Sequence, residues 1–180
     1  MNSNGALELF LKSFEHYYNV YTKNVEAPFV AEAEFKSHSE QYLLVKSAKL
    51  ADIDSNEYVF FYKHADDCAN NNDSQTQAAS SPLSPKILEE LSKLAWERAL
   101  LKVHPYYGHR NTDVTLIILS EKVCEEAFKL VKKLNFYKSY KLGFYGWSAF
   151  RLLVCETSSG RNASNRRGSD LKRIAGKLKG

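Results

Sequence analysis

The chain has 180 residues and a formal net charge of +4, with 44% hydrophobic and 26% charged residues. These values are typical of one globular domain whose core needs neither a metal ion nor a disulfide. Three widely separated cysteines without a CxxC pair favour a reduced, cytoplasmic protein over a disulfide framework. We read neither a secretory signal nor an apolar run long enough to cross a membrane, so we expect no membrane contact.

The positive charge is concentrated towards the C-terminal end. Residues 157–180 carry a net charge of +6, whereas residues 1–156 have 18 basic and 20 acidic groups, or −2. A basic segment of this kind favours a polyanion or an acidic protein surface as partner, or else serves as a solvated terminus. We expect one α/β domain over residues 1–156 and a basic tail with a short helix over residues 157–180.

The first half of the chain changes from helical to strand periodicity. Aromatic rings at spacings of three and four predict a helix over residues 7–21, capped by Ser3 or Asn4. Three strands of an antiparallel meander follow at 29–36, 41–50 and 58–62, separated by polar turns at 37–40 and 51–56. The last of these strands is apolar on both faces and is expected to be central. Residues 65–84 are predicted to form a polar surface loop.

The second half contains further helices and strands. Ser84 and Pro85 are typical of a helix start and predict a helix that ends at Val103. The segment 113–119 is rich in β-branched residues and predicts an interior strand, and Ser120 is expected to cap a helix that reaches Leu134. The remaining predictions are a hairpin over 135–155 about Gly146, a flexible basic loop, and a short helix over 170–178.

The predicted element order is therefore α-βββ-α-β-α-ββ-α. Helices and strands are mixed without strict alternation, which indicates an α+β fold with a single mixed, largely antiparallel sheet packed with helices.

This order resembles the core of the PD-(D/E)xK nuclease superfamily, whose chemistry needs two carboxylates on a divalent metal and a nearby lysine. Glu32, Glu34 and Lys36 alternate along one predicted strand and would share a face. That strand is the first of the meander, however, and the superfamily's motif belongs to the third, where Phe61 replaces the acid before Lys63. A magnesium-dependent nuclease with a site displaced to Glu34 and Lys36 is thus an alternative hypothesis.

Other catalytic and cofactor signatures are missing from the sequence. The histidines lack zinc-ligand spacing, and no GxGxxG, P-loop or GxSxG motif occurs, so we expect no metal site and no cofactor. A further alternative is a small-molecule pocket between the long helix and the hairpin, lined by His109 and Trp147.

Aromatic rings and cations interleave along the predicted hairpin. If they are exposed, such rings stack on bases while lysines contact phosphates, whereas buried rings belong to the core. We favour a non-catalytic binding or accessory protein that contacts an acidic partner or nucleic acid through the hairpin edge and the basic tail. The candidate binding residues are Lys138, Lys141, Arg151, Arg161, Arg166, Arg167, Lys172 and Arg173.

Several segments resemble a small, uncharacterised bacterial and archaeal family that is known only as a domain of unknown function. They are SNEYVFFYKH, KSYKLGFYGWSAFRLLV and NRRGSDLKRI. The layout of FEHYYNVYTKN and FVAEAEFKSHSEQYLLVKSAKL is also similar, so the resemblance covers most of the chain outside residues 65–84. It implies a bacterial domain and carries no activity, cofactor or catalytic residue with it.

Overall fold

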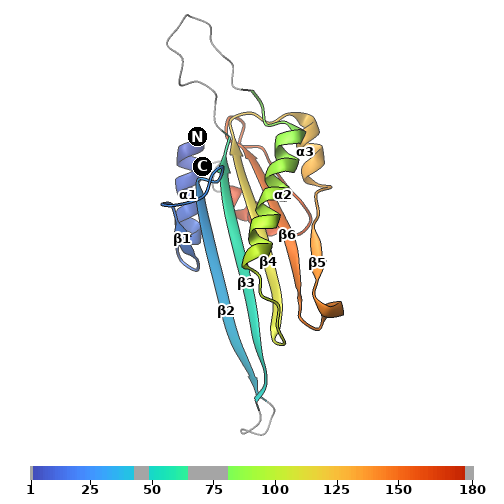
Figure 1. Ribbon diagram of the computed structural model, residues 1–180. Coiled ribbons are helices and arrows are strands. Elements are labelled where there is room, and N and C mark those ends of the chain that lie inside the picture. Colours follow the sequence, from blue (N-terminus) through green and yellow to red (C-terminus); the bar gives the residue numbers. More distant parts are fainter. Residues whose placement is uncertain (1, 43–48, 65–80, 177–180) are drawn as a thin grey trace, which may run out of the picture.

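A mixed β-sheet forms the middle layer of the molecule, and helices cover both of its faces (Figure 1). The computed structural model describes residues 2–42, 49–64 and 81–176, without the side chains of residues 38–42 and 49–53. This arrangement is the α+β fold with a single mixed sheet that the sequence predicts.

The sheet has a parallel centre and antiparallel edges. In spatial order its strands are β1 (Asn19–Tyr21), β2 (Ala31–Tyr42), β3 (Lys49–Lys63), β4 (His109–Ser120), β6 (Trp147–Glu156) and β5 (Tyr137–Ser139). β3, β4 and β6 are parallel, and the other neighbours are antiparallel. β7 (Asn162–Ser164) pairs with the end of β6 that β5 leaves free.

Two hydrophobic cores lie on opposite faces of the sheet. One is covered by α2 (Pro85–Lys102) and α3 (Glu125–Val131), and the other by α1 (Ser3–Phe14) and α4 (Lys172–Gly176). Alternate residues of β3 pack into the two cores: Phe60 faces α2, whereas Val59 and Phe61 face α1. The predictions of a central strand at 58–62 and of a helix opened by Ser84 are therefore confirmed.

The N-terminal helix is shorter than predicted. α1 ends at Phe14, and its N-cap is Asn2, whose side chain accepts a hydrogen bond from the Gly5 amide at 2.9 Å. Tyr17, Tyr18, Val20 and Tyr21 after the helix favour a strand, and β1 pairs with β2. The centre of the Tyr18 ring lies 4.8 Å from that of Phe14, although Tyr18 follows the end of the helix. The spacing of four residues between these rings therefore reflects a contact between them and does not require that the helix continues to Tyr18.

The turns predicted at 37–40 and 51–56 are wrong, because both segments belong to one long hairpin. β2 and β3 remain paired from Ala31 opposite Phe61 to Gln41 opposite Ala51. Figure 1 shows that this hairpin extends beyond the helices, where a polar sequence is compatible with a strand because neither face is covered. The predicted strand 41–50 and loop 65–84 lie partly outside the described residues.

The C-terminal half departs from prediction at two places. α3 begins at Glu125 rather than after Ser120, which belongs to β4 and donates its hydroxyl to the Lys122 carbonyl at 2.7 Å. The flexible loop predicted after the hairpin is also wrong. The chain instead forms β7 and then a 3-10 turn, η2 (Ser169–Leu171), that leads into α4.

The described part of the basic segment, residues 157–176, packs into the fold. Leu171 and Ala175 are buried under α1, and Ala163 joins the opposite core. The short helix predicted over 170–178 includes α4, whereas the isolated Ala163 gives no periodic signal in the sequence. Leu178, an apolar residue at the end of the helix predicted over 170–178, lies outside the described residues.

Candidate anion-binding groove

A four-residue turn, residues 165–168, fixes the chain between β7 and η2. The Asn165 side chain is buried, with 3% exposed, and makes four hydrogen bonds. Its Oδ1 accepts from the backbone amides of Leu152 at 3.1 Å and Gly168 at 2.9 Å. Its Nδ2 donates to the carbonyls of Leu134 at 3.1 Å and Phe150 at 3.0 Å. The amide thus uses both donors and both acceptor positions, tying the turn to β6 and to the segment before β5.

The other end of the turn is fixed by close packing. A Cβ atom on Gly168 would lie 2.7 Å from the carbonyl oxygen of Leu152 and 3.0 Å from its amide nitrogen. Only glycine lets the two backbones approach this closely. Arg166 and Arg167 therefore project from a backbone held at both ends. We call residues 165–168 the arginine turn.

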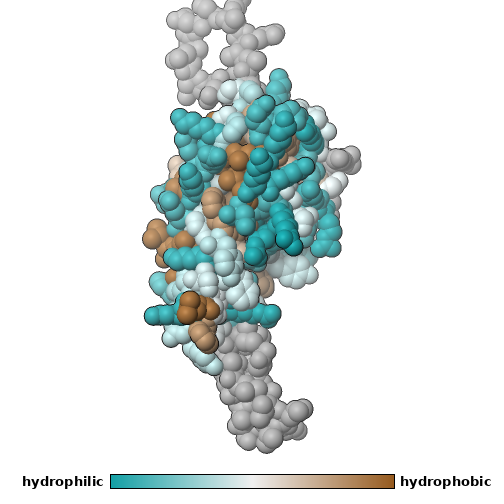
Figure 2. Space-filling model, turned by 90° about the vertical axis from the view of Figure 1, so that its right-hand side faces the viewer, coloured by the Kyte–Doolittle hydropathy of each residue, from teal (hydrophilic) through white to brown (hydrophobic). Residues whose placement is uncertain are grey.

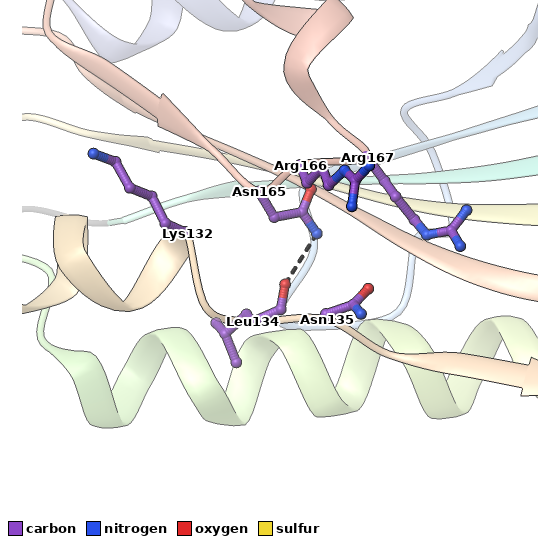
Figure 3. Close-up of a pocket in the computed structure, with 6 residues that line it drawn as sticks. All are labelled: Lys132, Leu134, Asn135, Asn165, Arg166 and Arg167. Atoms are coloured by element: carbon purple, nitrogen blue, oxygen red, sulfur yellow. Dashed lines mark hydrogen bonds between the residues drawn. The ribbon is translucent and has the colours of Figure 1, made fainter.

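Beside the arginine turn lies a groove of about 590 Å³. It is lined by Lys132, Leu134, Asn135, Asn165, Arg166 and Arg167. Figure 3 shows Lys132 on one side of the Asn165–Leu134 hydrogen bond and the two arginines on the other. The lining has three cations and no carboxylate, and none of the three forms a salt bridge within the described part of the chain. Such a groove favours an anion.

Positive charge continues from the groove along the edge strand β5. The Arg167 guanidinium lies 5.5 Å from the ring centre of Tyr137, and the Lys138 ammonium lies 5.5 Å from that of Tyr140. All three residues of β5 are exposed. Figure 2 looks onto this side of the molecule and shows a mostly hydrophilic surface interrupted by a few small hydrophobic patches.

The structure brings together only part of the predicted binding set. Arg166 and Arg167 share the groove, Lys138 is exposed on the edge strand β5, and Lys141 is exposed at the hairpin tip. Arg161 instead forms a two-point ion pair with Glu125 of α3 and lies over the Phe128 ring. Lys172 and Arg173 are exposed on α4, on the α1 side of the sheet.

Three groove residues escaped the sequence analysis. Asn135 begins the predicted hairpin and Lys132 lies three residues before it, so their place in the sequence next to the predicted binding surface was available as a signal. Asn165 gave no signal, because an asparagine in a polar stretch is typical of a loop. Three of its four partners, Leu134, Phe150 and Leu152, come from distant segments.

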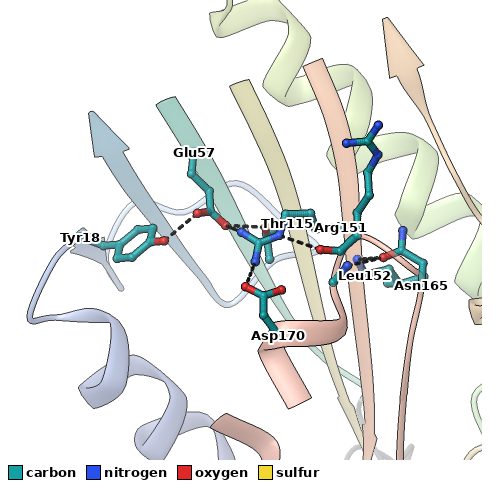
Figure 4. A network of polar contacts seen from close by, with 9 residues as sticks. Tyr18, Glu57, Thr115, Arg151, Leu152, Asn165 and Asp170 are labelled. Atoms are coloured by element: carbon teal, nitrogen blue, oxygen red, sulfur yellow. Dashed lines mark hydrogen bonds and ion pairs between the residues drawn. The ribbon is translucent and has the colours of Figure 1, made fainter. Parts of the chain in front are cut away.

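Arg151 lies in a network of charged and hydroxyl groups on the α1 side of the sheet, with 12% of its side chain exposed (Figure 4). Glu57 accepts hydrogen bonds from the hydroxyls of Tyr18 and Thr115, both at 2.6 Å, and from Arg151 at 2.7 Å. A second nitrogen of Arg151 donates to Asp170 at 2.5 Å. Burial opposes the charge of Arg151, but Glu57 and Asp170 outweigh that effect and raise its pKa. Arg151 is thus paired with two carboxylates of the fold, Glu57 and Asp170.

The network also supports the arginine turn. The Nε of Arg151 donates to the carbonyl of Arg167 at 3.3 Å, and the Asp170 partner lies in η2, directly after the turn. The backbone of the turn is therefore fixed from the sheet, whereas the side chains of its arginines remain directed to the surface.

Asp113 is an acid of this region whose pKa is raised. It lies opposite Glu57 in the register of β3 and β4 and lines a cavity of about 450 Å³ with Arg151, Arg167 and Asp170. Burial raises the pKa of Asp113, Glu57 adds to the rise, and Arg151 opposes it. Burial, reinforced by Glu57, likewise raises the pKa of Tyr18, so its hydroxyl remains a donor.

The nuclease candidates lie on the other face of the sheet. Glu34 and Lys36 form an ion pair at 2.9 Å, and Glu32 pairs with Lys102 of α2 at 2.9 Å. Within residues 2–42, 49–64 and 81–176, no group of three or more His, Cys, Asp or Glu side chains is arranged to hold a metal ion.

His109 and Trp147 lie at the beginnings of β4 and β6. The buried His109 ring has one nitrogen 2.8 Å from the Tyr145 carbonyl and the other 2.9 Å from the Thr112 hydroxyl. Because β3 and β4 separate β2 from β6, Trp147 is roughly 14 Å from β2 across the sheet. The structure therefore does not bring these two residues together with Glu32, Glu34 and Lys36 in one cleft.

The fold and the groove define an α+β domain with a cationic groove at the β5–β7 edge of its sheet. The chain belongs to the family described as a domain of unknown function, DUF8052, whose model matches residues 2–176. The match confirms the resemblance to an uncharacterised family and includes the described part of the basic segment. No curated protein and no solved structure shows significant similarity to the chain. In the described residues, no helix has the length and apolar character needed to cross a membrane.

Proposed function

We propose that the protein is a non-catalytic binding module of the cytoplasm that holds an extended polyanion along the β5 edge. The observation that carries the proposal is the groove formed by Lys132, Arg166 and Arg167, three cations without a carboxylate among the lining residues. Lys138 extends the positive surface along β5.

The fixed backbone of the arginine turn supports this function energetically. Arginine side chains present planar groups that match phosphate and carboxylate oxygens. Because the turn is held by Asn165 and Gly168, the loss of backbone freedom on binding is small. A ligand that neutralises these charges also releases counterions, which makes the affinity strongly dependent on salt.

The test is fluorescence anisotropy with labelled polyanions: an oligonucleotide, a sulfated polysaccharide and polyglutamate. Four contacts with a single-stranded oligonucleotide, from Lys132, Arg166, Arg167 and Lys138, give an affinity that falls about 50-fold between 50 and 200 mM salt. We expect the double variant Arg166→Glu/Arg167→Glu to abolish most binding at 50 mM salt.

A double variant with the same change in net charge provides the matched control. Lys12→Glu/Lys23→Glu alters two exposed lysines, on α1 and after β1, away from the groove. It is expected to retain most of the affinity. Equal losses in the two variants would show that only overall charge matters, and absence of binding to all three polyanions at 50 mM salt would reject the function.

A further inference from the structure

The β5 edge exposes large aromatic and apolar side chains beside its cations. Tyr137 is 53% exposed, Phe144 is 75% exposed and Leu142 is 97% exposed. Such side chains are commonly buried, and several of them along one edge indicate an interaction surface. The Arg167 guanidinium lies over one face of the Tyr137 ring, which joins this ring to the groove.

The hairpin tip holds its exposed residues on a defined backbone. The 3-10 turn η1 (Lys141–Gly143) contains two non-glycine residues in the left-handed region, Lys141 with φ 48° and Leu142 with φ 55°. Each costs about 1 kcal/mol and persists only where the surrounding structure holds it.

Backbone hydrogen bonds supply that support. The carbonyl of Tyr140 accepts from the amides of Gly143 at 2.9 Å and Tyr145 at 3.2 Å, and the Tyr140 amide donates to Gly146 at 3.0 Å. A Cβ on Gly146, where φ is +74°, would lie 2.3 Å from the Arg110 carbonyl oxygen, so the tip also packs closely against the start of β4. The tip is therefore ordered, and it directs Leu142 and Phe144 outward instead of into the core.

We propose that the β5 edge is a track for single-stranded nucleic acid, with bases stacked on Tyr137 and Phe144 and phosphates on Arg166, Arg167 and Lys138. This inference rests on the proposed polyanion-binding function and specifies the ligand class. Exposed rings interleaved with cations match a chain of alternating bases and phosphates. A base pair within a duplex has both faces stacked, so only an unpaired strand offers faces to these rings.

An acidic peptide satisfies the cations but has no bases to stack on the rings. It could instead add a strand to the exposed edge of β5 by main-chain hydrogen bonds. Such a peptide would be insensitive to the loss of the rings, so the two ligands give different outcomes.

The experiment measures anisotropy with a labelled 12-mer single strand, the corresponding duplex and a polyglutamate peptide, all at 50 mM salt. Tyr137→Ala and Phe144→Ala are compared with wild type and with Tyr137→Phe, which keeps the ring. We expect each alanine variant to bind the single strand about 5-fold or more weakly, while its duplex affinity is unchanged and Tyr137→Phe behaves like wild type. Because both side chains are exposed, the variants should keep the wild-type circular dichroism and melting temperature.

The outcomes separate the two proposals. If the single strand binds and Arg166→Glu/Arg167→Glu abolishes binding, but both alanine variants bind as wild type, the base-stacking inference is wrong and the polyanion function stands. Tighter binding of the duplex or of polyglutamate overturns the inference in the same way. If none of the three probes binds, the base-stacking inference falls, and if the sulfated polysaccharide also fails to bind, the polyanion function falls with it.

Discussion

Glu57 and Asp113 face each other across β3 and β4, yet their surroundings differ. Glu57 receives three hydrogen bonds, from Tyr18, Thr115 and Arg151. No described residue donates a side-chain hydrogen bond to Asp113, and the carboxylate is half-buried. Asp113 therefore lacks the side-chain donors that Glu57 has, and its burial raises its pKa.

This difference predicts a pH dependence of stability. The pKa of Asp113 in the folded state is raised above its ordinary value of 3.8, so the folded state binds the proton more tightly than the unfolded state does. The stabilisation of the folded state by protonated Asp113 is therefore complete below pH 3.8. It is lost as the pH rises through the raised pKa of Asp113 in the folded state. Burial is the largest cause of the raised pKa; among the charged groups near Asp113, Glu57 and Asp170 add to the rise, whereas Arg151 and Arg167 oppose it.

Replacement by asparagine tests this prediction. Asp113→Asn should unfold at higher urea concentration than wild type at pH 7, and the difference should shrink as the pH falls towards 3.8. Glu8→Gln, which neutralises an exposed acid of α1, is the control and should change the midpoint little. An asparagine variant less stable than wild type at pH 7 would show that the Arg151 attraction outweighs burial.

At the scale of elements, the arginine turn depends on one side chain. Asn165→Ala removes four hydrogen bonds and leaves backbone groups of Leu152, Gly168, Leu134 and Phe150 without this partner. We expect the free energy of unfolding to fall by about 2–4 kcal/mol, because buried polar groups lose their partners. Urea denaturation measures it as a lower midpoint with an unchanged slope.

Asn135→Ala makes the same chemical change at an exposed asparagine of the same groove. Its free energy of unfolding should stay within about 0.5 kcal/mol of wild type. If the Asn165 variant is equally stable, the four hydrogen bonds do not hold the turn.

Elements with strong local signals were predictable from the sequence. The cap and proline before α2 and the β-branched run of β4 gave correct element types, because each signal depends on neighbours in the chain. The outer part of the β2–β3 hairpin was predicted as turns. Alternating hydrophobicity marks a strand only where one face is buried, and no helix covers this part of the hairpin. β7 and the arginine turn were missed because their stability comes from contacts with β6 and with residues before β5.

At the scale of the whole molecule, basic residues and packing residues share the same segment. Residues 157–176 supply the arginines of the groove, the strand β7 and the buried Leu171 and Ala175. The positive charge is therefore carried by part of the folded domain and is positioned by it. A polyanion bound there would contact a preformed surface rather than order a free tail.

This arrangement predicts that a chain shortened to residues 1–156 does not keep the stability of the full domain, because the removed segment is part of the fold. Such a chain loses β7, the Asn165 hydrogen bonds and the Asp170 partner of Arg151, and it uncovers Leu153 and Cys155, which are now 0% and 1% exposed. Burial of Leu171 and Ala175 and the hydrogen bonds of Asn165 together contribute about 5 kcal/mol or more. For a protein of this size the melting temperature should fall by about 10 °C or more, or the cooperative transition should disappear, as measured by calorimetry. Cooperative melting within a few degrees of the full chain would instead mean that residues 157–180 are a separable tail, and the groove would then lose the fixed backbone on which its proposed function depends.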